Sequence, residues 1–119
     1  MKAFSRVLSV TCLLAGITGV ASAAQVTGIL MDKMCSAAAV KQGQAFATKH
    51  DTKCALEPDC QKTGYGVFTA DDKFIALDAA GNAKAAAALK ATKKIDNLRV
   101  TVEGDVTGDT IKVSSLKLQ

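Results

Sequence analysis

The chain has 119 residues, of which 22% are charged, and its formal net charge is +4. This length corresponds to one small domain, and the charge excess is too small to indicate a protein that binds nucleic acids by electrostatic attraction. The sequence contains four cysteines, one histidine and one proline.

The first 23 residues have the layout of a secretory signal peptide. Lys2 and Arg6 precede an uncharged apolar run over residues 7–20, and residues 21–23 (Ala-Ser-Ala) are small, as signal peptidase requires. The apolar run is too short to span a bilayer. We therefore expect cleavage after residue 23 and export to the periplasm or the medium. Residues 24–119 contain no second run of spanning length, so no membrane segment is expected after cleavage.

Residues 24–119 are expected to form a single domain that begins with a strand and a helical insertion. Residues 25–31 are apolar and β-branched, which predicts a strand, and Gly28 indicates a bulge or a bend within it. Residues 36–49 are rich in alanine, lysine and glutamine, which favours short helices divided at Gly43. Residues 50–62 contain Pro58 and are expected to be irregular.

The second half of the chain predicts two hairpins separated by a helix. Residues 64–69 and 73–78 are expected to form the first hairpin, and residues 83–92 the helix, with Asn82 as its N-cap.

The last two strands are expected at residues 98–106 and 110–118, joined by a turn at Gly108-Asp109. A change of side-chain parity in the last strand predicts a β-bulge near Ser114-Ser115. Together these elements predict a mainly β protein with one or two helices, a five-stranded OB-fold-like barrel with an insertion at residues 32–62. The alternative is an open antiparallel sheet with one helix across it.

Two features resemble known bacterial proteins. The final segment VTVEGDVTGDTIKVSSLKL, with the signal peptide and the order of five strands, resembles the small exported OB-fold proteins. The pattern D-x-x-C, H-x-x-x-C, a third cysteine and then GYGV resembles an uncharacterised family of small exported proteins. The resemblance spans nearly all of residues 24–119. It implies the fold, export and a recurrent Cys/His cluster, and no established activity; exported OB-fold proteins are usually regarded as ligand-binding or stress-related.

The residues best suited to chemistry all lie in the insertion. They are Cys35, His50, Cys54 and Cys60, which include every cysteine after the signal peptide and the only histidine. Three sulfurs and one imidazole can bind zinc tetrahedrally, and thiolates also suit copper(I). Asp32 and Met34 lie beside Cys35, where they can orient His50 or supply a further ligand.

A disulfide is the competing prediction for the same cysteines. Exported proteins fold in an oxidising compartment. A bridge between two of Cys35, Cys54 and Cys60 would stabilise an insertion with few large apolar residues by ~2–4 kcal/mol. We expect this insertion to be held by its sulfurs and His50. Because three is an odd number, the remaining thiol stays free, binds a metal or links two chains.

Two further functions are alternatives. A thiol-dependent periplasmic enzyme would use Cys35 or Cys54 with His50, although the chain has no C-x-x-C motif. A module for single-stranded nucleic acid or oligosaccharide would use Tyr65 and the phenylalanines of the first hairpin, which are more readily explained as core residues. The favoured hypothesis is a small exported binding or stress-response module, not an enzyme, in which a disulfide locks the insertion or the insertion binds zinc or copper.

Overall fold

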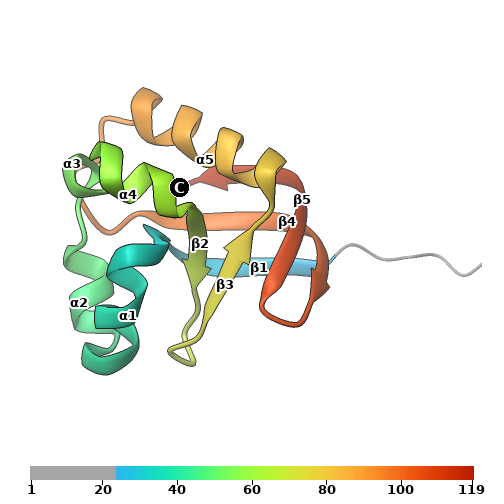
Figure 1. Ribbon diagram of the computed structural model, residues 1–119, viewed down its shortest axis with the longest axis horizontal. Coiled ribbons are helices and arrows are strands. Elements are labelled where there is room, and N and C mark those ends of the chain that lie inside the picture. Colours follow the sequence, from blue (N-terminus) through green and yellow to red (C-terminus); the bar gives the residue numbers. More distant parts are fainter. Residues whose placement is uncertain (1–23) are drawn as a thin grey trace, which may run out of the picture.

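The computed structural model describes residues 24–119 (Figure 1), and the signal peptide predicted at residues 1–23 lies outside the described residues. In chain order the elements are β1 (Ala24–Asp32), α1 (Lys33–Gln42), α2 (Gln44–Lys49), α3 (Thr52–Ala55), α4 (Pro58–Thr63), β2 (Tyr65–Phe68), β3 (Phe74–Leu77), α5 (Ala79–Ala91), β4 (Arg99–Thr107) and β5 (Thr110–Leu118). In this part of the chain no helix is both long enough and apolar enough to cross a membrane.

The five strands form one closed sheet in the order β1-β2-β3-β5-β4, because β4 also pairs with β1. Only β3 and β5 are parallel, which excludes the alternative of an entirely antiparallel sheet. The predicted strands agree with the observed ones to within one residue at each end. The prediction of a mainly β protein with one or two helices was wrong, since residues 24–119 form a mixed α/β domain with five helices.

Gly28 lies where β1 changes from one partner strand to the other. Residues 24–29 pair with β4 and residues 29–32 pair with β2, without a register shift in β1. The bulge predicted at Gly28 is therefore absent. A Cβ atom at this position would collide with the carbonyl oxygen of Phe68, so glycine permits the close approach of two backbones.

The bulge predicted in the last strand is present. Glu103 pairs with Ser115 and Gly104 pairs with Val113, which leaves Ser114 as the additional residue in β5. The Ser114 hydroxyl donates a hydrogen bond to the Glu103 carbonyl at 3.0 Å. This bulge accounts for the change of side-chain parity along the strand.

Two apolar clusters lie on opposite faces of β1. Leu30 faces the barrel interior, which is closed by Ala85 and Leu89 of α5. Ile29 and Met31 face the other way, because side chains alternate along a strand. They pack with Phe68 and with two alanines of the insertion, Ala39 and Ala47. The second cluster therefore holds α1 and α2 against the barrel.

The insertion between β1 and β2 is more helical than predicted. Residues 50–62, expected to be irregular, contain α3 and α4. Asp51 begins α3 by accepting a hydrogen bond from the Cys54 amide at 2.6 Å. Pro58 is the first residue of α4, where its missing N–H is not needed. Proline thus marks the start of a helix here. Figure 1 shows α1–α4 gathered at one end of the barrel.

The helix α5 begins at Ala79 and is capped by Asp78 instead of Asn82. The Asp78 carboxylate accepts hydrogen bonds from the Gly81 amide at 2.9 Å and from the Val113 amide of β5 at 3.2 Å. Asn82 lies inside the helix, and its side-chain oxygen accepts a hydrogen bond from the Tyr65 amide at 2.8 Å. The predicted cap is therefore wrong, because Asn82 joins α5 to β2.

Candidate metal centre

Asp32 connects the barrel to the candidate metal centre. It is the last residue of β1 and the N-cap of α1, and its Oδ2 accepts a hydrogen bond from the Cys35 amide at 2.9 Å. Its side chain is fully buried, and Oδ1 lies 2.8 Å from Nε2 of His50. One carboxylate therefore fixes the helical turn that carries Cys35 and contacts the only histidine.

His50 ends α2, and its ring is buried beside the Asp32 carboxylate. Its backbone N–H donates to the carbonyls of Phe46 and Ala47, and its side chain is 2% exposed. Nε2 lies 2.8 Å from Asp32 Oδ1, the distance of an ion pair, whereas Nδ1 has no partner among the described residues. Buried polar atoms are rarely left unpaired, so this imidazole is suited to bind an additional group.

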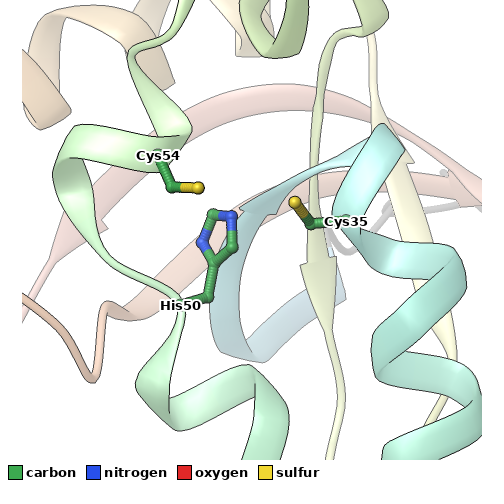
Figure 2. Close-up of side chains that lie close together, drawn as sticks. All are labelled: Cys35, His50 and Cys54. Carbon is green, nitrogen blue, oxygen red and sulfur yellow. The ribbon is translucent and has the colours of Figure 1, made fainter.

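Cys35 and Cys54 present their sulfurs to this imidazole. One donor atom from each of Cys35, His50 and Cys54 lies within 4.8 Å of the other two. Figure 2 shows the imidazole ring between the two thiols. His50 and Cys54 belong to different elements, since His50 ends α2 and Cys54 lies in α3. The turn at Asp51 brings them together.

Cys60 belongs to a second group that shares Cys35 with the first. Cys60 lies in α4 and is buried, and donor atoms of Asp32, Cys35 and Cys60 lie within 4.8 Å of one another. The structure therefore places the four predicted ligands in one cluster centred on Cys35. Asp32, predicted to assist, belongs to this cluster as well.

Met34, the other predicted auxiliary residue, does not line the solvent-accessible pocket that opens onto the cluster. Its side chain is 52% exposed, and its amide donates a hydrogen bond to the Thr63 hydroxyl at 3.3 Å. Consecutive side chains of a helix point about 100° apart, so Met34 and Cys35 face different directions.

All three cysteines of the described chain are free thiols, and burial raises their pKa values. Burial, together with the charge of Asp32, raises the pKa of Cys35 to about 12. Burial alone would raise the pKa of Asp32, but the contacts with His50 and the Cys35 amide outweigh it, and this pKa lies below its ordinary value. The thiols therefore stay protonated at neutral pH beside an ionised carboxylate, until a cation displaces their protons.

A pocket of about 370 Å³ opens onto the cluster. Its walls are formed by Cys35, Gln42, Ala45, Phe46, Lys49, His50, Asp51 and Cys54. Cys35 and Cys54 are only partly buried, so an ion from solvent can reach their sulfurs through this pocket.

Comparisons with known proteins found no relatives: no protein-family model, no curated protein and no solved structure matches the chain. The function is therefore inferred from the geometry of this site.

Proposed function

We propose that this protein is an exported OB-fold module that binds one soft metal ion, zinc or copper(I), through Cys35, His50 and Cys54. The observation that carries the proposal is the buried imidazole of His50: its Nδ1 has no hydrogen-bond partner among the described residues, and one of its nitrogens lies within 4.8 Å of two thiols. Two sulfurs and one ring nitrogen are the donor set that both ions prefer.

The strand order supports the assignment to the OB-fold. The sheet closes in the order β1-β2-β3-β5-β4, β3 and β5 are parallel, and α5 lies between β3 and β4 in the chain. OB-folds are five-stranded barrels that often place their ligands at the loops between strands. The candidate metal centre lies in the loop between the first two strands, which supports a role in binding.

Zinc and copper(I) make different demands on the cluster. Structural zinc takes four ligands, and the fourth position can be taken by Cys60 or Asp32, which lie near Cys35, or by a ligand that enters from the pocket. Copper(I) is selected by the softness of the sulfurs. Either ion must displace the protons of the thiols, so binding is coupled to proton release.

A disulfide would exclude the metal. The sulfur of Cys35 lies within 4.8 Å of the sulfur of Cys54 and within 4.8 Å of the sulfur of Cys60. Oxidation of Cys35 with either neighbour removes a ligand from the site. We therefore propose that export without metal leads to a disulfide, whereas a bound metal keeps the thiols reduced.

Metal titration of the reduced protein tests the proposal. Native mass spectrometry is expected to show one zinc or one copper(I) ion per chain, and Cys54→Ser and His50→Ala are each expected to weaken binding. Lys53→Ala is the matched control, because Lys53 lies on the same helix as Cys54 but does not line the pocket. A folded, fully reduced protein that retains neither ion would refute the assignment.

The thiol-dependent enzyme is less well supported. A nucleophilic cysteine requires a lowered thiol pKa, whereas burial raises the pKa of Cys35, Cys54 and Cys60. Slow alkylation of all three at neutral pH is the result expected for a binding protein.

A second pocket supports a different candidate, an oligosaccharide-binding role. It has a volume of about 450 Å³ and lies between α1, β3 and the β4–β5 turn, with walls formed by Val40, Asp72, Lys73, Phe74, Ile75, Gly108 and Asp109. Two acids and one lysine disfavour a phosphate backbone, whereas an aromatic ring among polar groups suits a sugar. Chemical-shift changes at Phe74 on addition of oligosaccharides would support this role, and their absence would remove it.

A further inference from the structure

The pocket in front of the candidate metal centre leaves one side of the site open. Cys35, His50 and Cys54 line the pocket, whereas Asp32 and Cys60 are buried and do not. An ion held by the three lining residues would therefore face the pocket. A molecule in the pocket can reach that ion directly.

The walls of the pocket carry one cation that is free to meet a ligand. Ala45 and Phe46 supply apolar surface, and Oδ1 of the Asp51 carboxylate accepts a hydrogen bond from the Cys54 amide. Lys49 is exposed, and within residues 24–119 its ammonium group has neither an ion pair nor a hydrogen bond. A ligand with one anionic group would pair with Lys49.

We infer that this pocket binds a small molecule that carries both a thiol and a carboxylate, with the size of free cysteine. The inference rests on the proposed metal site. The ligand's sulfur coordinates the metal beside Cys35 and Cys54, its thiol proton passes to solvent, and its carboxylate pairs with Lys49. Soft metals select sulfur donors, and a volume of about 370 Å³ is near the lower end of the ~300–1,000 Å³ typical of small-molecule sites.

Cobalt(II) provides a spectroscopic probe for this ligand. The purified, reduced protein is loaded with cobalt(II), whose thiolate-to-metal charge-transfer band grows with the number of sulfur ligands. Addition of cysteine is expected to intensify the band to saturation while the metal stays with the protein after gel filtration. Cysteamine, which has the thiol but no carboxylate, is expected to bind about fivefold more weakly, as the loss of one ion pair implies.

Two lysine variants test the role of Lys49. Lys49→Ala is expected to bind cysteine as weakly as cysteamine, whereas Lys53→Ala, outside the pocket, is expected to keep the preference for cysteine. Equal binding of both ligands by the wild-type protein would overturn the inference.

The remaining outcomes separate this inference from the proposed function. If cobalt(II) stays bound but its spectrum does not respond to cysteine, or if cysteine removes the metal, the ligand inference fails and the metal site stands. If the reduced protein binds none of cobalt(II), zinc and copper(I), the proposed function fails and the ligand inference fails with it.

Discussion

Each cysteine of the candidate metal centre is the third residue of a helix that follows an acidic N-cap. Asp32 precedes the helix of Cys35, Asp51 precedes that of Cys54, and Glu57 precedes that of Cys60. Both aspartates accept a hydrogen bond from the amide of the cysteine three residues later. Capping therefore sets the position of two sulfurs, because it fixes the first turn of the helix that carries them.

The capping role of Asp51 predicts a loss of metal affinity when it is replaced. Asp51→Ala is expected to release the first turn of α3, a loss of about 1 kcal/mol for an N-cap, and to weaken metal binding by loosening Cys54. Asp51→Asn keeps the oxygen that accepts the hydrogen bond, so it is expected to stay close to wild type. Competition with a chromophoric chelator measures both. Equal affinity of the alanine variant and the wild type would contradict this role.

The raised thiol pKa values predict that metal binding strengthens as pH rises. Since the pKa of Cys35 is about 12 and that of Cys54 is also raised, both thiols carry protons near neutral pH and must lose them on binding. Between about pH 6 and pH 8, affinity is expected to rise by up to about tenfold per pH unit for each thiol. Chelator competition at several pH values measures this slope. Cys54→Ser is expected to lower it by one proton, and a slope unchanged by that substitution would contradict Cys54 as a ligand.

For single residues, the sequence predicted which side chains form the candidate metal centre better than it predicted how they are positioned. Cys35, His50, Cys54 and Cys60 were identifiable because these residue types are rare within residues 24–119. Asp51 and Lys49 were missed, although the D-x-x-C pattern of Asp32 recurs at Asp51 and signals a second capped helix. Lys49 gave no signal, because a lysine at a helix end is ordinarily explained by the helix dipole.

The insertion is attached to the rest of the protein by contacts that do not involve sulfur. The Tyr65 hydroxyl donates to the Ala55 carbonyl at 2.6 Å, the Thr52 hydroxyl donates to the Lys94 carbonyl at 2.7 Å, and the Asn97 amide donates to Thr48. The expectation that only the sulfurs and His50 hold the insertion was therefore wrong. The insertion has few large apolar residues, but its alanines also contribute to packing, because their small side chains lie closely against Phe68.

The Tyr65–Ala55 hydrogen bond predicts a coupling between barrel and metal site. Tyr65→Phe leaves the buried Ala55 carbonyl without this donor and is expected to reduce stability by about 1–2 kcal/mol. Because Ala55 follows Cys54 in α3, metal affinity is expected to fall as well. Val102→Ala is a control that removes volume from the barrel core without touching this hydrogen bond or the cluster that holds α1 and α2. Urea unfolding with and without metal measures both quantities, and a purely stability-related loss with unchanged affinity would contradict the coupling.

Asp78 joins α5 to β5, which predicts a pH dependence of stability. Hydrogen bonds from the amides of Gly81 and Val113 hold its pKa below the ordinary value of 3.8. A lowered carboxyl pKa contributes stability that is present above the unfolded pKa and is lost as pH falls through the folded one. Asp78→Asn is therefore expected to show a smaller loss of stability below about pH 4 than the wild type. Denaturant unfolding across this range measures the difference, and parallel pH profiles would contradict it.

For the whole molecule, the order of the strands along the chain was readable from the sequence, whereas their pairing within the sheet was not. Apolar and β-branched runs bounded by turn residues located the strands, but the parallel pairing of β3 with β5 joins residues far apart in the chain. The insertion leaves and re-enters the barrel at one point, because the Lys33 amide donates to the Gly64 carbonyl at 2.9 Å. Because the two ends of the insertion lie side by side, a binding site can be built in the insertion with little change in the strands of the barrel.

Closure depends on Gly28, which predicts a large destabilisation by a single methyl group. In Gly28→Ala the added Cβ would meet the Phe68 carbonyl, a backbone group that cannot turn aside, so β1 must separate from β2 or from β4. We expect a loss of at least about 2 kcal/mol. Gly108→Ala is the matched control: its φ is +61° but its Cβ has no neighbour within 4 Å, so its cost is limited to about 1 kcal/mol of backbone strain. Denaturant unfolding of the reduced, metal-free proteins compares the two. A Gly28→Ala variant as stable as Gly108→Ala would contradict the prediction that the close approach of β1 and β2 requires glycine at this position.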